Sequence, residues 1–460
     1  MTPYLFLLAY FSGAAATMVR GPIYGVYLYA FAFYFTPYRT WWEDSVPDLR
    51  YLQLAAILTL ASSIIHGPWT AAGKNRMTGG VWLLVVLLVW MVTTSLWEVT
   101  GSWHRLGLTL FAKHLLVTVL VVRIVQEREQ VRLFLLVNVI GGAWLGWLAW
   151  GKTGSRLEGV AGALGDANTL GMYLSAILII ASLMFLGHRG RYRIVAFLCL
   201  PLILNTVVLS GSRGAFVALV AGGLVAGWYC PRKLKLGFGL AGTLGVVMFF
   251  MLASDGFLER IATLTAFGEG TEEVNETSGS RLEIARAGWE MFKDHPMGTG
   301  FKGTNVLSGR YMEDSLLTAG DVRSAHNSLM SVLVDFGLVG ISIYLLLYLW
   351  MFRKLGAVKR WADTSGDKST GAMVAGVAGA LAVVFVAGQS SDYYYAELQY
   401  WLLGITAVFV NQLERLKGEA ESINPAPRPS GVLSESRGAY LRHAASGVQV
   451  TANPRENMLR

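Results

Sequence analysis

The chain has 460 residues, of which 54% are hydrophobic and only 15% are charged. This composition excludes an ordinary soluble globular protein. The net charge of +8 would suit a nucleic-acid-binding protein. However, the basic residues are spread over alternate loops between apolar segments, which argues against nucleic acid as a partner.

Thirteen apolar segments are candidates to cross a hydrocarbon core, which takes roughly 20 residues. Because backbone polar groups in lipid must be satisfied within the segment, each segment is predicted to be a helix. The first two are short, so the sequence predicts an all-α polytopic membrane protein with about 12–13 transmembrane helices. In chain order the segments lie near residues 3–19, 22–37, 51–66, 79–97, 107–125, 131–150, 167–187, 192–210, 214–230, 234–253, 327–352, 370–388 and 393–412.

Alternate loops between these segments are rich in Lys and Arg. Under the positive-inside rule the basic loops face the cytoplasm, and the long polar loop of residues 254–326 faces outside. The N-terminus lacks a basic region before its apolar run and a clear cleavage site, so no removable signal peptide is expected. The basic positions are Arg20, Lys74, Arg76, Arg123, Arg128, Arg132, Arg189, Arg191, Arg193, Arg232, Lys233, Lys235, Arg353, Lys354, Lys359 and Arg360.

The transmembrane domain is predicted to span residues 1–412 and to include the outer loop. Residues 413–460 are rich in Pro, Ser, Gly, Arg and Glu and show no apolar period. We therefore expect a disordered cytoplasmic tail there. Cys199 and Cys230 lie within or at the end of apolar segments and indicate neither a disulfide nor a zinc site.

The outer loop contains the signals of one helix. Ser280 and Glu283 have the spacing of a capping box, which predicts a helix start at that point. The helix is expected to stop before Pro296, because the residue before a proline avoids helical geometry. The sequence thus predicts a helix at about residues 281–294 inside the outer loop.

Arg281 falls on the apolar side of that predicted helix. On a helical wheel it lies with Ala285, Trp289 and Phe292, opposite an arc of charged residues. A cation turned toward a membrane or a core needs a partner. Arg281 is therefore a candidate to bind an anionic group, and the alternative is that its side chain extends outward to water.

Arg213 begins an apolar segment on the outer face, just after Ser212. The free N–H groups and the positive dipole end of a helix N-terminus disfavour a cation unless an anion is also present. With an anion, the amides and the guanidinium would bind it together. The alternative is a simple turn that carries an interfacial arginine.

His326 and Asn327 repeat this arrangement at the start of the next long segment, where Asn327 or Ser328 could cap the helix. The positive end of the helix dipole disfavours imidazolium, so His326 would be largely neutral near pH 7 and able to accept a proton. Two cations and a neutral imidazole on one face predict a site for an anionic group such as a diphosphate. Alternatively, His326 is an interfacial residue that caps the helix or packs against its neighbours. Further candidates for substrate contacts on outward loops or helix ends are Arg156, Asn168, Ser212, Asn327 and Asp392. Asp335 is a charged residue inside an apolar segment, where a charge is a functional candidate.

These residues resemble the motifs of the O-antigen ligase and polymerase superfamily of bacterial membrane glycosyltransferases. The resemblance covers about residues 155–352, and a fainter similarity upstream extends it to the O-glycosylation ligases found with exosortase systems. The motifs are Ser212-Arg213-Gly214-Ala215, Gly279-Ser280-Arg281 followed by Trp289, His295-Pro296-Met297-Gly298-Thr299-Gly300, His326-Asn327 and Asp335-Phe336-Gly337-Leu338-Val339-Gly340.

The resemblance implies a GT-C-like helical fold in the bacterial inner membrane with the active site facing the periplasm. It implies transfer of a glycan from undecaprenyl diphosphate to a lipid A core or a protein hydroxyl, without nucleotide sugar, cofactor or metal. By position, Arg213 and Arg281 would bind the diphosphate, and His326 would activate or orient the acceptor hydroxyl. Inverting, single-displacement chemistry is expected, because no nucleophilic carboxylate stands out.

Two other functions remain open. A polymerase of the same superfamily would use the same chemistry with a carrier-linked repeat unit as acceptor. A transporter or lipid-glycan flippase would differ more, because transporters tend to place binding groups at mid-membrane in broken helices of two repeated halves. Here the candidate residues gather on the outer edge and no repeat is evident.

Overall fold

The computed structural model describes residues 2–67, 75–152, 157, 164–253, 272–317 and 322–423. Within these ranges the chain forms helices and no β-strand, which confirms the all-α prediction. A helix lies at each predicted apolar segment. These helices are α1 (Pro3–Arg20), α2 (Ile23–Tyr34), α3 (Tyr51–Ile65), α4 (Gly79–Thr94), α5 (Ser102–Ile124), α6 (Arg128–Ala149), α7 (Ala167–Gly187), α8 (Arg191–Leu209), α9 (Arg213–Tyr229), α10 (Lys235–Leu252), α14 (Ser328–Ser365), α15 (Lys368–Ala387) and α16 (Glu397–Ile423).

Seven helical segments in the described residues are long and apolar enough to cross a membrane: α5, α6, α7, α8, α10 with the turn before it, α14 and α15. The helices α2, α3, α4 and α9 are apolar but shorter. The chain is therefore an all-α polytopic membrane protein. The exact number of crossings remains a prediction.

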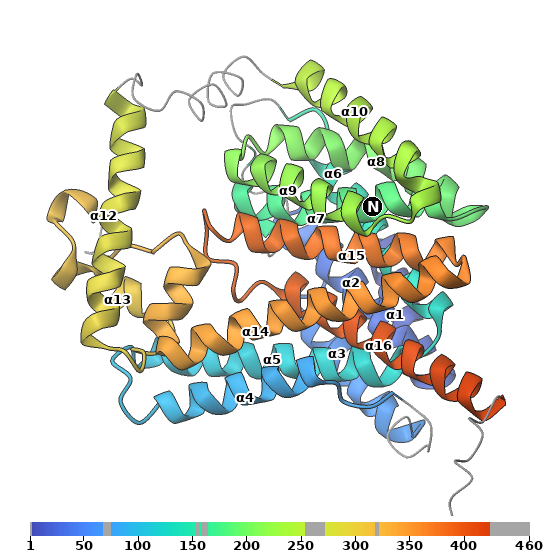
Figure 1. Cartoon of the computed structure of the whole chain (residues 1–460), viewed down its shortest axis with the longest axis horizontal. Helices are drawn as coiled ribbons and strands as arrows, with labels where there is room; N and C mark the ends of the chain where they lie inside the picture. Colours follow the sequence, from blue (N-terminus) through green and yellow to red (C-terminus); the bar gives the residue numbers. More distant parts are fainter. Residues whose placement is uncertain are drawn as a thin grey trace, which may run out of the picture. The chain divides into compact units, whose positions relative to one another are not determined.

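Helix α15 lies inside the bundle, between α7 and α9 on one side and α14 on the other (Figure 1). Its most apolar stretch of 18 residues is 89% buried. Small residues make this possible, since they let helix backbones approach closely. A methyl group on Gly379 would lie 2.8 Å from the carbonyl oxygen of Gly222 in α9. The core of the bundle thus depends on glycine contacts between α9 and α15.

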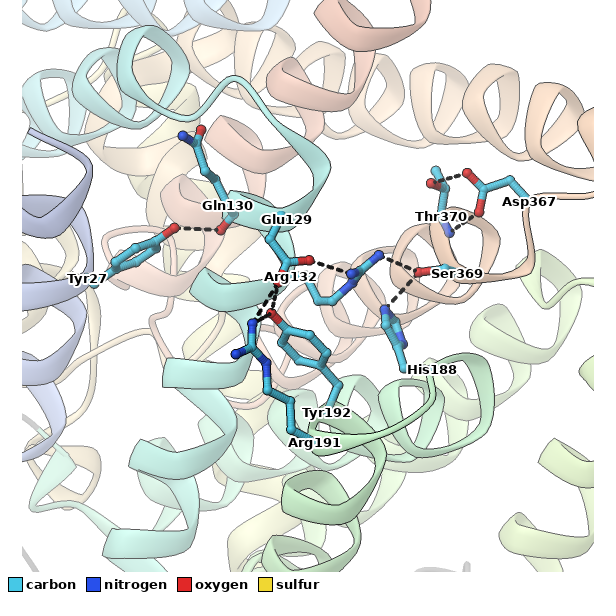
Figure 2. Close-up of polar contacts among 10 residues, drawn as sticks. All are labelled: Tyr27, Glu129, Gln130, Arg132, His188, Arg191, Tyr192, Asp367, Ser369 and Thr370. Carbon is cyan, nitrogen blue, oxygen red and sulfur yellow. Dashed lines mark hydrogen bonds and ion pairs between the residues drawn. The ribbon is translucent and has the colours of Figure 1, made fainter.

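A polar network ties together the helix ends that carry the basic loops (Figure 2). Arg132 of α6 donates to Glu129 Oε2 at 2.5 Å and to Ser369 Oγ of α15 at 3.1 Å. Ser369 Oγ also lies 3.0 Å from Nε2 of His188, between α7 and α8. Arg191 of α8 donates to Glu129 Oε1 at 3.1 Å. These contacts fix α6, α8 and α15 to one another at this end.

The outer loop contains α12 (Glu272–Asp294) and α13 (Gly303–Tyr311). The helix α12 crosses α14 near its start (Figure 1). It begins at Glu272, earlier than the predicted start at Ser280, so the capping-box spacing lies inside a helix. A Ser and a Glu at that spacing mark an N-terminus only where the preceding residues are not helical. The helix ends at Asp294, before Pro296, as expected.

The buried stripe of α12 lies beside the apolar arc of the helical wheel. Ile284, Ala287 and Met291 pack with Val334 of α14 in a small apolar cluster. Trp289, which lies on that arc, is 50% exposed. Tertiary packing chose the neighbouring stripe, because that stripe meets α13 and α14.

Helix α14 is broken near its start by Gly337, whose φ of 66° and ψ of −165° are not helical. The loop after α12 crosses this break. Thr299 N–H donates to Val334 O at 3.0 Å, and Gly300 N–H donates to Asp335 O at 2.8 Å. In return, Leu338 N–H donates to Pro296 O at 3.0 Å. The loop therefore satisfies backbone groups that the break in α14 releases.

The last described helix, α16, continues to Ile423, past the predicted end at residue 412. The first residues of the predicted disordered tail are thus helical. The rest of that tail, residues 424–460, lies outside the described residues. The compact unit that contains the other described helices ends at Leu413, within α16.

Candidate functional site

A pocket of about 350 Å³ lies where α12 crosses the start of α14. Its polar lining is Arg281 of α12, His326 and Asn327 before α14, and Gln389 after α15. Its apolar lining comes mainly from α14, namely Leu329, Met330, Leu333, Ile341 and Leu345, with Ala285 and Ala325. The apolar residues lie progressively further along α14 from His326. The pocket therefore changes from charged to apolar along that helix.

The apolar part of the pocket reaches the outer surface of the bundle. Leu345 lines it and is 43% exposed, and its neighbours Leu346 and Leu349 are 49% and 46% exposed. They belong to a helix long and apolar enough to cross a membrane. Exposed leucines on such a helix are expected to face lipid. A lipid chain thus has an apolar path to Arg281 and His326.

His326 has an unusual backbone conformation, with a φ of 45°. Positive φ is uncommon outside glycine and tends to persist where the surrounding structure enforces it. Here the next residue, Asn327, caps α14 by accepting from Met330 N–H at 3.0 Å, as predicted for this position. The cap fixes the imidazole at the N-terminus of α14, beside the positive end of its dipole.

Asp392 braces the segment that carries His326. Its carboxylate accepts from Ser331 Oγ at 2.7 Å, from Asn327 N–H at 3.2 Å and from Ser324 Oγ. Only 7% of its side chain is exposed. These donors occupy much of the carboxylate. Asp392 therefore positions the segment before α14, a role that its place in the sequence alone did not reveal.

Lys302 is a cation at this site that the sequence reasoning missed. Its Nζ donates to Tyr395 Oη at 3.2 Å, lies 4.7 Å from the centre of that ring and lies 4.0 Å from Asp392 Oδ2. Only 19% of the Lys302 side chain is exposed. The signal available in the sequence was a lysine two residues after the glycine-rich run that ends at Gly300.

Asp335 holds the backbone of Lys302 in place. Its two carboxylate oxygens accept from the N–H groups of Lys302 and Gly303, each at 2.8 Å, and Tyr394 Oη donates to it at 2.5 Å. Lys302 has a left-handed backbone, with φ 66° and ψ 28°. The charge predicted inside an apolar segment is therefore satisfied by backbone donors, and it sets the direction of Lys302.

The electrostatics of the pocket keep the imidazole neutral. Desolvation lowers the pKa of His326. The carboxylate of Asp392 opposes this effect, whereas the cations Arg323, Arg281 and Lys302 lower the pKa further. His326 is nevertheless exposed, and it lines the pocket. A neutral imidazole near pH 7 can accept a proton.

Lys302 stays charged in this environment. Burial by itself would lower the pKa of its ammonium group, but Tyr395 and Asp392 outweigh that effect, and the net shift is upward. The site therefore combines a neutral base with fixed cations. Such an arrangement can bind an anionic ligand next to an imidazole that accepts a proton.

Arg213 does not line this pocket. It is half-buried in the first turn of α9, where Ser212 caps the helix by accepting from Ala215 N–H at 3.2 Å. The adjacent Gly214 packs against Ser390 Oγ, next to the pocket residue Gln389. The structure thus brings Arg281 and His326 together in one pocket and places Arg213 beside the turn that borders it.

Asn168 does not line the pocket either. Asn168 is half-buried in the first turn of α7, where Asp166 caps the helix. Arg156 lies outside the described residues. Within the described ranges, no group of three or more His, Cys, Asp or Glu side chains is arranged to hold a metal ion.

The comparisons with known proteins point to one family. Residues 198–345 match the family model described as O-antigen ligase. A search of curated proteins found no match. The matched segment includes Arg213, Arg281, Lys302 and His326, so it contains the cations and the imidazole described above. Over this segment, the chain is similar to the O-antigen ligases.

Proposed function

We propose that the protein transfers a glycan from undecaprenyl diphosphate to an acceptor hydroxyl at the periplasmic face of the inner membrane. One observation carries the proposal. The pocket places Arg281 and His326 at the head of an apolar wall that continues to the exposed leucines of α14. A polyprenyl chain would lie along that wall, and its diphosphate would meet the cations.

The chemistry follows from the charges. The acceptor oxygen attacks the anomeric carbon of the glycan, and the bond from that carbon to the diphosphate oxygen breaks. The electron pair leaves with undecaprenyl diphosphate, and the hydroxyl proton passes to Nδ1 or Nε2 of His326. A neutral imidazole is suited to take that proton near pH 7. Attack opposite the leaving group in one displacement inverts the anomeric configuration.

The cations stabilise the leaving group. Negative charge grows on the diphosphate as the glycosidic bond breaks, and fixed cations in a partly dry site stabilise that charge best. Arg323, Arg281 and Lys302 all lie close enough to His326 to lower its pKa. Of these, Arg281 lines the pocket. We assign Arg213 a second contact to the donor, supported by the packing of Gly214 against Ser390 at the border of the pocket.

A ligase and a polymerase would share every step above and differ only in the acceptor. A ligase uses a lipid A core or a protein hydroxyl, and a polymerase uses another carrier-linked repeat unit. We propose the ligase, with membership of the exosortase-associated group as a further expectation. Offering both acceptors to the purified protein in separate reactions separates the two functions.

The central experiment is transfer in vitro from a synthetic undecaprenyl-diphosphate glycan, with EDTA present throughout. The variants are His326→Ala, Arg281→Ala and Arg213→Ala. We expect losses on the order of 10²-fold or more for His326→Ala, in the range of general acid–base catalysis. Arg281→Ala should lose more activity than Arg213→Ala, because only Arg281 lines the pocket.

Arg286→Ala is the matched control, because Arg286 is exposed on the same helix as Arg281 and does not line the pocket. It should retain wild-type transfer. Full activity in all three variants at His326, Arg281 and Arg213 would refute the mechanism. Loss of activity in EDTA would refute its metal independence.

A further inference from the structure

A second cavity, of about 740 Å³, lies on the surface formed by α9, α10 and the second half of α14. It has no part in the proposed transfer. Cations and aromatic side chains line most of it. These residues are Arg232, Lys235, Arg353, Lys359 and Arg360, with Trp228, Tyr229, Phe352 and Gly356.

The charge of this cavity is largely uncompensated. Lys359 Nζ pairs with Asp363 Oδ2 at 2.6 Å. In the part of the chain that the structure describes, no carboxylate forms an ion pair with any of the other four cations. Four like charges around one cavity repel one another unless an anion joins them. The guanidinium groups of Arg232, Arg353 and Arg360 are suited to phosphate oxygens, which they bind as a fork.

The cavity lies at the opposite end of α14 from the candidate active site. At about 1.5 Å per residue, the stretch from His326 to Phe352 covers roughly 39 Å, compared with a hydrocarbon core of about 30 Å. The two sites therefore fit the two faces of one bilayer. With the active site outside, as proposed above, the basic cavity faces the cytoplasm.

The surroundings of the cavity are apolar and exposed. Trp228, in its wall, is 77% exposed. Helix α10 starts at the cavity and runs along the rim of the bundle beside α8 and α9 (Figure 1). Its most apolar stretch of 18 residues is only 6% buried. Leu236 and Leu240 are 77% and 63% exposed. A ligand held by the cations would thus lie beside a surface suited to acyl chains.

We propose that this cavity binds the phosphate headgroup of an anionic phospholipid from the cytoplasmic leaflet. The cations supply the headgroup contacts, and the exposed faces of α9 and α10 receive the chains. Basic pockets between transmembrane helices on this side commonly bind such headgroups. A soluble phosphate would satisfy the same cations but would leave the apolar surface without a ligand. The proposal rests on the membrane orientation of the proposed function, not on glycan transfer.

The test measures lipid binding by native mass spectrometry of the full chain in detergent. Phosphatidylglycerol and phosphatidylcholine are titrated in separate series. The pocket variant is Arg232→Gln with Arg353→Gln. The control is Lys233→Gln with Lys354→Gln, which removes two charges from the same segments at positions that do not line the cavity. Gel filtration confirms that both variants are folded.

We expect phosphatidylglycerol to bind the wild type and the control alike. The pocket variant should bind it on the order of 30-fold more weakly, since each cation contributes about 1 kcal/mol. Phosphatidylcholine should bind all three weakly. Equal binding of phosphatidylglycerol by the pocket variant and the control would overturn the proposal. So would competition by inorganic phosphate at the concentration of the lipid, because the ligand would then be a soluble anion. Glycan transfer is not measured, so the outcome does not depend on whether the protein transfers a glycan.

Discussion

Gly298 and Gly337 lie backbone to backbone where the loop after α12 crosses the break in α14. A methyl group on Gly337 would lie 2.7 Å from the nitrogen of Gly298, and one on Gly298 would lie 2.6 Å from Asp335 O. Both glycines have positive φ, of 94° and 66° respectively. This contact sets the position of the loop that carries Lys302 relative to the helix that begins beside His326.

Gly337→Ala should therefore destabilise the protein. Its φ and ψ are accessible in practice only to glycine, and the added methyl would collide with backbone atoms that cannot move independently. We expect a loss of at least about 2 kcal/mol in the free energy of unfolding. Thermal unfolding in detergent measures it. Gly223→Ala in α9, where nothing lies within 4 Å, should be neutral or slightly stabilising. Equal stability of the two variants would contradict the prediction.

Asp335→Asn should destabilise the protein nearly as much as Gly337→Ala, although aspartate and asparagine have the same shape. An asparagine has only one acceptor oxygen, so its NH₂ group would face the N–H of either Lys302 or Gly303. Leaving a buried donor unsatisfied costs about 1–3 kcal/mol. Thermal unfolding again measures the loss. Asp294→Asn, at an exposed carboxylate that accepts from Tyr311 Oη, is the control and should change stability little.

The pH dependence of transfer should report the cations around His326. The neutral imidazole is the active form, so the rate rises with pH through the pKa of His326. The environment lowers that pKa, so activity should persist below the usual range of a histidine, near 6.5. A midpoint near pH 6.5 in the rate profile of the wild type would contradict this prediction.

Substitutions of the neighbouring charges should move that profile in opposite directions. Lys302→Met removes a cation that lowers the pKa of His326, so the acid limb should move to higher pH. Asp392→Asn removes the carboxylate that raises it, so the limb should move to lower pH. Rate profiles between pH 5 and pH 8 measure both shifts. A purely structural role for either residue would lower the rate without moving the midpoint.

His326→Gly should separate stability from activity. Glycine relieves the positive φ of this position, which costs on the order of 1 kcal/mol for another residue, but it adds a similar entropic cost to folding. We expect the free energy of unfolding to stay within about 1 kcal/mol of the wild type while transfer is lost. His326→Val should unfold at a distinctly lower temperature, because a β-branched residue tolerates positive φ poorly. If valine is tolerated as well as glycine, the backbone there is not constrained.

The helices, one helix cap and the family resemblance could be predicted from patterns along the chain. Each predicted apolar segment is a helix, because backbone in lipid has few alternatives. Asn327 caps α14 as expected, since capping depends on a few adjacent residues. The motifs around Arg281 and His326 also pointed to a family whose model matches residues 198–345.

The tertiary structure decided what distant residues do to one another. Sequence periodicity left open whether the apolar arc of α12 faces a core or the membrane, and contacts with α13 and α14 bury the neighbouring stripe of Ile284 and Met291. Nothing local shows that Asp335 holds the backbone of Lys302, or that Lys302 approaches Asp392, since these contacts join segments far apart in the chain. Helix formation depends on neighbours in sequence and can be read from it. The charge around an imidazole depends on neighbours in space, which only the packing of α12, α14 and their loops brings together.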